Sequence, residues 1–174
     1  MPSRYCVIVD TAEKRPLPRI THLPLATPTG TRTVQIEWRR KALNTGDYAL
    51  SGHESGHVFE RKGSISELYD NLLTADRLRF LREIHRARSL RRFTILVEQD
   101  PATLSTVPPF RKGVSPVRAR DALVRLLLAY PWIDLWMFSG KTPTQRRAIS
   151  EWMVSALILS SEHVDGSPHN HQPV

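Results

Sequence analysis

The spacing of apolar residues changes at Ser64, and no other feature of the sequence constrains the fold as strongly. Before this point, apolar residues alternate or form short β-rich runs of the kind found in strands. The segments predicted as strands are 5–9, 33–38, 48–50 and 57–62. From Ile65 to Ile84, apolar residues recur every three or four positions, as on the buried face of a helix. A chain with this order of elements must cover a sheet with that helix.

The second half of the chain continues to alternate between strands and helices. The predicted strands are 93–98 and 132–138, and the predicted amphipathic helices are 121–129 and 143–160. The proline-rich segments predicted as loops are 14–31 and 100–117. Because helical connections join strands that run in the same direction, we expect the later strands to be parallel. The predicted fold class is α/β, with a central mixed β-sheet flanked by helices.

Length and composition suit one folded domain. We predict this domain at residues 1–162 and a polar, disordered tail at 163–174. No apolar run approaches the roughly 18 residues of a membrane span, and the first residues lack the apolar core of a signal peptide. The single cysteine, Cys6, excludes an internal disulfide and a cysteine-rich zinc site. We therefore expect no membrane association and an intracellular location, which is cytoplasmic if the chain is bacterial or phage-encoded.

The net charge indicates a polyanionic partner. Lys and Arg outnumber Asp and Glu by 25 to 17, which makes the formal charge +8 and the pI about 10.2. Such a surplus commonly serves nucleic acid, although a solubilising surface is the alternative explanation. The candidate DNA-binding residues lie in the basic clusters of the second half: Arg77, Arg111, Lys112, Arg118 and Arg120.

Two carboxylates and a lysine form the candidate chemical site. Alternate residues of a strand share a face, so Glu60 and Lys62 point the same way and Arg61 points the other way. A hairpin through Gly52–Gly56 would bring Asp47 close to both. Carboxylate oxygens suit Mg²⁺, and a lysine beside the ion can orient or deprotonate its water. The alternative is a solvated strand face preceded by a turn aspartate.

The order of these residues resembles the XPF family of structure-specific endonucleases. That family is characterised by Gly-Asp, a variable spacer, Glu-Arg-Lys, three residues and Asp; here Gly46-Asp47 precedes Glu60-Arg61-Lys62. Three further segments resemble the family in the right order, so that the resemblance covers about residues 5–160. They are Val7-Ile8-Val9-Asp10 with Glu13, the Arg77-Leu78 pair in the first helix, and Ile95-Leu96-Val97-Glu98.

The resemblance implies a restriction-endonuclease-like three-layer sandwich with a metal-dependent nuclease site. In that site Asp47 and Glu60 would bind Mg²⁺ or Mn²⁺, with the Arg61 carbonyl as a further ligand, and Lys62 would position the attacking water. Two further metal ligands or water-orienting groups would be Asp10 and Glu13, for which a strand-end cap and a surface charge are the alternatives. The Arg61 side chain would contact phosphate or support the site from the other face.

The sequence departs from the family pattern in two places. The family's Asp after Glu-Arg-Lys and three residues falls on Ser66, so Glu67 either replaces it or that role is lost. Ser64 followed by Glu67 is also a capping-box pattern, which predicts that a helix begins there. The family's accessory domains have no counterpart in 174 residues, so the resemblance implies a stand-alone nuclease domain of the phage or mobile-element type.

The expected activity is hydrolysis of phosphodiester bonds in DNA that is branched, forked or flapped. The alternative is a catalytically silent DNA-binding pseudo-nuclease subunit that supports an active partner, and an RNA-directed role rests on charge alone. Residues Trp152, Met153, Leu157 and Ile158 are predicted core, with a share of this surface as an alternative homodimer interface. His53 and His57, beside the hairpin turn, are predicted to be exposed.

Overall fold

Seven strands form one mixed sheet in the order β2-β3-β1-β4-β5-β6-β7. The computed structural model describes residues 3–104 and 115–165 of the 174. The strands are β1 (Arg4–Val9), β2 (His22–Thr27), β3 (Gly30–Arg40), β4 (Tyr48–Leu50), β5 (His57–Lys62), β6 (Arg92–Val97) and β7 (Ile133–Met137). The helices are α1 (Ile65–Leu73), α2 (Arg77–Ala87), the 3-10 turn η1 (Pro101–Leu104), α3 (Pro116–Ala129) and α4 (Pro143–Asp165).

The strand directions divide the sheet into two parts. On one side of β4, β1 is parallel to β3 and β2 is antiparallel to β3. On the other side β5, β6 and β7 run parallel, as helical connections predict. The short strand β4 joins the two parts by antiparallel pairing with both β1 and β5. The hairpin of β4 and β5 therefore lies near the middle of the sheet.

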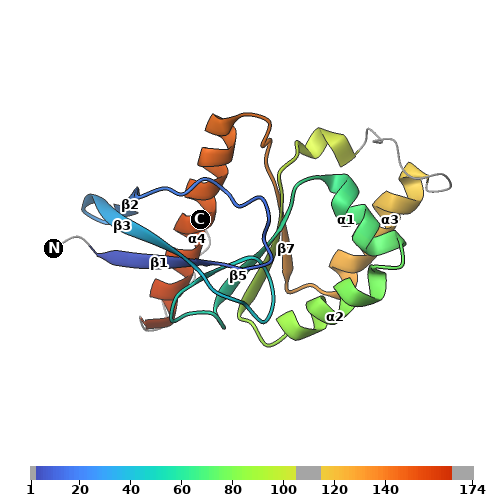
Figure 1. Cartoon of the computed structure of the whole chain (residues 1–174), viewed down its shortest axis with the longest axis horizontal. Coiled ribbons are helices and arrows are strands. Elements are labelled where there is room, and N and C mark those ends of the chain that lie inside the picture. Colours follow the sequence, from blue (N-terminus) through green and yellow to red (C-terminus); the bar gives the residue numbers. More distant parts are fainter. Residues whose placement is uncertain (1–2, 105–114, 166–174) are drawn as a thin grey trace.

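Helices cover both faces of this sheet, which makes three layers (Figure 1). One face packs against α4, whose Ile149, Met153 and Leu157 join Val9 and Phe59 in a buried cluster. The opposite face packs against α1, α2 and α3 in a second cluster. The predicted fold class, a mixed sheet flanked by helices, is confirmed. Within the described residues, no helix combines the length and the apolar character needed to cross a bilayer.

Two predicted boundaries in the first half were wrong. The expected loop 14–31 contains strand β2, which tolerates Pro24 because it lies at the edge of the sheet and pairs with β3 alone. The expected single helix is two helices. Thr74 ends α1, because its hydroxyl and its backbone N–H both donate to the Asp70 carbonyl oxygen, at 2.7 and 3.1 Å. The break allows α2 to take its own direction beside α1.

The second half also differs from prediction at its boundaries. Helix α3 begins at Pro116, because proline is tolerated in a first turn and the Ser115 hydroxyl accepts a hydrogen bond from Arg118 N–H at 3.2 Å. Helix α4 continues to Asp165, into the expected tail, and residues 166–174 lie outside the described part of the chain. Trp152 was wrongly predicted as core, since 61% of it is exposed. The homodimer stays a prediction.

His57 is buried, which contradicts the expectation of an exposed turn histidine. Only 3% of it is exposed. Its ring stacks on Phe59 at 4.3 Å between centroids, and its two nitrogens lie within hydrogen-bond distance of the hydroxyls of Thr94 (2.8 Å) and Ser160 (3.0 Å). Burial, with a smaller effect of Arg92, lowers the pKa of His57 to about 4. The imidazole is therefore neutral in the folded protein at pH 7.

We expect acid to destabilise the fold through His57. Between its unfolded pKa of about 6.5 and its folded pKa of about 4, the unfolded state binds more protons. The unfolding free energy should thus fall by about 3 kcal/mol from pH 7 to pH 4 through this one group. Urea unfolding as a function of pH should show that this slope is lost in His57→Gln and kept in His53→Gln. An unchanged slope in His57→Gln would contradict the assignment.

Candidate active site

Strand β5 directs Glu60 and Lys62 to one face of the sheet, as strand alternation predicts. Lys62 Nζ donates to Glu60 Oε1 at 2.6 Å and lies 5.3 Å from the centroid of the Phe80 ring on α2. Both side chains are buried, with 6% of Glu60 and 7% of Lys62 exposed. Because Phe80 of α2 lies beside Lys62 on this face of β5, Glu60 and Lys62 are not on a solvated surface.

Asp47 is held against β5 by its own backbone and side chain. Its N–H donates to the Phe59 carbonyl oxygen at 2.7 Å, and its carbonyl oxygen accepts from Asp10 N–H at 2.8 Å. Its carboxylate Oδ2 accepts from Arg61 N–H at 2.7 Å. Gly46 makes this approach geometrically feasible: its φ is +73°, and an added Cβ would lie 2.4 Å from a Val58 methyl group.

Asp47, Glu60 and Lys62 line one hollow at the end of β5. The hollow has two adjoining parts, of about 360 and 210 Å³, and Asn71 of α1 and Arg79 of α2 line both of them with the trio. Glu13 and Glu67 line the larger part, and Glu83 of α2 lines the smaller. We call this hollow the catalytic cavity, after the candidate catalytic residues that line it. The predicted convergence of a carboxylate from the turn with two residues of β5 is thus present in the structure.

Carboxylates in the catalytic cavity are held in an environment that disfavours their charge. Burial raises the pKa of Asp47 to about 7; the Arg61 N–H opposes this rise, and Glu13 adds to it. Burial also raises the pKa of Glu60, against the effect of Lys62. Burial lowers the pKa of Lys62, but the adjacent Glu60 outweighs this and leaves it raised. The basic residues that line the cavity do not offset the effect of burial on Asp47 and Glu60, so a further positive charge close to both would stabilise the ionised carboxylates.

Asn71 carries a buried polar atom without a partner. Only 7% of the residue is exposed, and its Oδ1 accepts no hydrogen bond from the described residues. A buried amide oxygen in this state costs about 1–3 kcal/mol unless a ligand, ion or water satisfies it. Because Asn71 lines both parts of the catalytic cavity, its oxygen adds a third oxygen donor beside Asp47 and Glu60.

The structure does not bring the four predicted metal ligands together. Asp10 accepts from the backbone N–H groups of Ala12 and Leu43, both at 2.7 Å, which is the behaviour of a strand-end cap. Glu13 pairs with the Arg61 guanidinium at 3.2 Å. Over residues 3–104 and 115–162, no group of three or more His, Cys, Asp or Glu side chains is placed to hold a metal ion. Of the four predicted ligands, Asp47 and Glu60 line both parts of the catalytic cavity, whereas Asp10 lines only the smaller part and Glu13 only the larger.

Glu67 lies at the rim of the cavity and caps α1. Its N–H donates to the Ser64 hydroxyl at 3.2 Å, and its Oε2 accepts from Gly63 N–H at 2.8 Å. The predicted helix start at Ser64 is confirmed. In a capping box the Glu67 carboxylate would accept from Ser64 N–H, whereas here it accepts from the N–H of the preceding residue, Gly63. Glu67 remains exposed at the cavity rim.

Arg61 connects the catalytic cavity to the opposite face of the sheet. Its guanidinium pairs with Glu13 and, through Nε, with Glu98 Oε1 at the end of β6. Arg146 of α4 donates to the other oxygen of Glu98 at 2.7 Å. A buried charge is retained where opposite charges surround it, so this network anchors β5 between β6 and α4. Of the two roles predicted for Arg61, the contacts are those of support.

Known proteins resemble this chain in structure and not in sequence. No protein-family model matches the chain, and no curated protein matches it significantly in sequence. The structure is similar to that of XPF from Aeropyrum pernix, with a TM-score of 0.55 and 22% sequence identity, over 91% of this chain and 68% of that chain. The chain has the fold of XPF. The mixed seven-stranded sheet between helices is consistent with the restriction-endonuclease-like fold.

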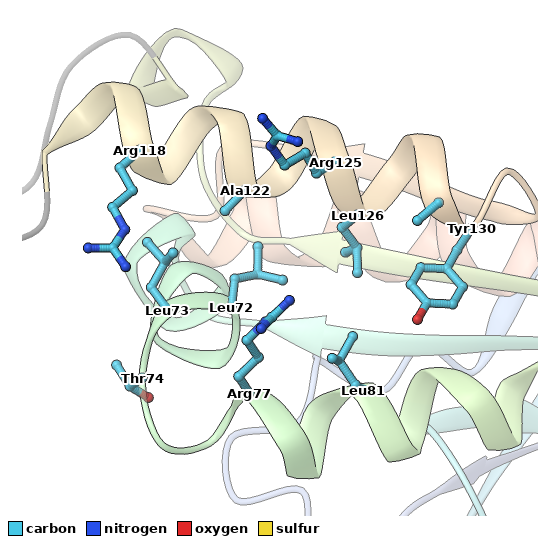
Figure 2. A pocket seen from close by; sticks show the side chains of 11 residues that line it. Leu72, Leu73, Thr74, Arg77, Leu81, Arg118, Ala122, Arg125, Leu126 and Tyr130 are labelled. Carbon is cyan, nitrogen blue, oxygen red and sulfur yellow. The ribbon is translucent and has the colours of Figure 1, made fainter.

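The predicted DNA-binding residues lie at several places. Arg77 and Arg118 line a second cavity between the helices (Figure 2). Arg120 is exposed and pairs with Asp121 at 3.0 Å. Arg111 and Lys112 fall outside the described residues. Of the five predicted residues, the structure therefore brings Arg77 and Arg118 together at one cavity.

Sequence reasoning missed three residues of the catalytic cavity: Asn71, Arg79 and Glu83. Asn71 lies on the apolar face of α1 with Leu68 and Leu72. A polar residue on such a face was the feature of the sequence that could have indicated a site residue. Arg79 and Glu83 are four residues apart and share a face of α2. Because many arginines surround them in the sequence, they looked like residues of a solvated helix surface. Their place in the cavity depends on the direction of α2, which begins after the break at Thr74.

Proposed function

We propose that this chain is a metal-dependent DNA endonuclease that hydrolyses phosphodiester bonds. The observation that carries the proposal is the convergence of Asp47, from the turn before β4, with Glu60 and Lys62 of β5 on one cavity beside α1 and α2. The fold shared with XPF and the Gly-Asp … Glu-Arg-Lys order support it. The charge of +8 is suited to a polyanionic substrate.

The residues of the catalytic cavity fit a divalent ion of the Mg²⁺ or Mn²⁺ type. Mg²⁺ is commonly held by only one or two protein carboxylates, with waters and substrate phosphate completing its coordination. Asp47 and Glu60 would hold the ion, and the unpartnered Asn71 Oδ1 is a suitable further oxygen. When bound, the ion would lower the pKa of a water and neutralise charge on the phosphate. Its charge would also relieve the raised pKa values of both carboxylates.

Lys62 would act as a hydrogen-bond donor. Its raised pKa keeps the ammonium group protonated at neutral pH, so it orients a water or a phosphate oxygen and does not accept a proton. Glu60 holds that ammonium group in place through the 2.6 Å hydrogen bond. Arg79, at the cavity wall, would add a positive charge for the phosphate. Arg61 would keep β5 in register through its ion pairs.

We further propose that the substrate is branched, forked or flapped DNA, as the family resemblance implies. The test compares fork, flap and linear duplexes of the same sequence, each with Mg²⁺, with Mn²⁺ and with EDTA. We expect cleavage with either metal, none with EDTA, and the fastest cleavage on the branched DNAs. DNA binding without cleavage under every condition would instead favour the catalytically silent subunit.

A further inference from the structure

A second cavity lies on the helical side of the molecule, between α1, α2 and α3. Its volume is about 500 Å³. Figure 2 shows Leu72 of α1, Leu81 of α2 and Leu126 of α3 directed into the space between the helices, with Tyr130 at one end. We call this cavity the interhelical groove. The side chains at the bottom of the groove are apolar, so the groove would bind a fully hydrated ion poorly.

Three arginines give the interhelical groove a positive edge. Arg77, Arg118 and Arg125 line it, and no aspartate or glutamate of the described residues does. In Figure 2 the side chain of Arg77 extends from α2 toward Leu72, and that of Arg118 extends from α3 beside Leu73. Neither forms an ion pair with a described residue, and the neighbouring Asp121 is paired with Arg120. Guanidinium groups placed in this way favour a ligand with phosphate oxygens.

The interhelical groove lies next to the catalytic cavity. The two share the walls of α1 and α2: Asn71 lines the catalytic cavity and Leu72 the groove, while Arg79 lines the catalytic cavity and Arg77 the groove. Neighbouring residues of a helix point about 100° apart, so the two cavities lie on different sides of helices that are about 10–12 Å across. A strand whose phosphate is bound at the catalytic cavity would therefore reach the groove within a few nucleotides.

We propose that the interhelical groove binds an unpaired nucleotide of a DNA single strand next to the cleavage site. The base lies on the leucines and Tyr130, and the adjoining phosphates lie between Arg77 and Arg118. A duplex offers only its phosphates to such a groove, because its bases are stacked and paired, whereas a single strand offers both. This inference rests on DNA being the substrate, and it assigns the single-stranded arm of a branch to this side of the molecule.

The experiment measures binding in EDTA, so that it does not depend on cleavage. Fluorescence anisotropy would compare a labelled single strand, the same strand with abasic sites, a linear duplex and an acidic peptide. The groove variant is Arg77→Ala with Arg118→Ala, and the matched control is Arg39→Ala with Arg88→Ala. The control removes the same charge from exposed residues that do not line the groove.

We expect the groove variant to lose at least tenfold in affinity for the single strand and much less for the duplex. Each lost phosphate contact should lower the salt dependence, log K against log salt, by about 0.7, or about 1.4 for two. The wild type should bind the intact strand several-fold more tightly than the abasic strand. Equal losses in the groove and control variants, equal binding of the abasic strand, or preference for the acidic peptide would each overturn the inference.

These outcomes are separable from those of the proposed function. If no DNA is cleaved with either metal but the groove variant loses single-strand affinity as expected, the groove assignment stands and the nuclease proposal fails. If DNA is cleaved but the groove variant binds single strands as the control does, the nuclease proposal stands and the groove assignment fails.

Discussion

Replacing Lys62 by methionine or Asp47 by asparagine should reduce metal-dependent DNA cleavage by about 10²- to 10⁴-fold while DNA binding is retained. Lys62→Met keeps an unbranched side chain, one atom shorter, and removes the ammonium group that lines the catalytic cavity. Asp47→Asn keeps the shape and the acceptor for Arg61 N–H but removes the negative charge needed for a metal ion. Both losses should appear in the rate of the chemical step, measured under single-turnover conditions with saturating enzyme.

Measurement of the unfolding free energy should distinguish a lost chemical step from misfolding of the variants. Asp47→Asn removes a carboxylate whose charge is disfavoured by burial, so its unfolding free energy should equal or exceed that of the wild type. Matched controls are Lys41→Met and Asp134→Asn, which alter exposed ion pairs with Glu54 and Arg92 and should cleave normally. Full activity in either Lys62→Met or Asp47→Asn would show that the cleavage site lies elsewhere.

Gly46→Ala should destabilise the fold by about 2–4 kcal/mol, from a left-handed backbone that disfavours a Cβ and from overpacking. The added Cβ would lie 2.4 Å from Val58 Cγ1 and 3.0 Å from the Phe59 carbonyl oxygen, and the latter is backbone that cannot move without disturbing β5. That same carbonyl accepts the Asp47 N–H, so relief of the contact would shift Asp47 as well. Cleavage should therefore fall together with stability.

Gly52→Ala is the matched control for this prediction. Its φ is +85°, close to that of Gly46, but a Cβ there meets nothing within 4 Å. It should cost only the backbone penalty of about 1–2 kcal/mol and leave cleavage unchanged in the folded protein. Denaturant unfolding of the two variants measures the difference, which is the contribution of the close approach. Equal destabilisation by both would mean that Gly46 is required for its conformation alone.

Local patterns in the sequence were sufficient for every strand of the sheet except β2 and for the placement of the central trio. Alternation in a strand has a period of two, so Glu60 and Lys62 share a face wherever the strand is placed. The turn at Gly52–Gly56 returns the chain, which brings Asp47 beside β5. The start of the first helix at Ser64 followed from a hydrogen bond between residues three apart. Each of these depends on neighbours in sequence, and for that reason the sequence alone determined them.

Tertiary structure decided whatever depends on residues far apart in the chain. His57 is buried because α4 and β6 supply Ser160 and Thr94, which no pattern near residue 57 could indicate. Asp10 accepts hydrogen bonds from the N–H groups of Ala12 and Leu43, and Glu13 pairs with Arg61, and no pattern near residues 10 to 13 indicated the contacts with the distant Leu43 and Arg61. Asn71 enters the catalytic cavity because α1 packs against β5, and Arg79 enters it because α2 starts anew after α1 ends at Thr74. Local periodicity sets which way a side chain points, but packing between distant segments sets what it meets.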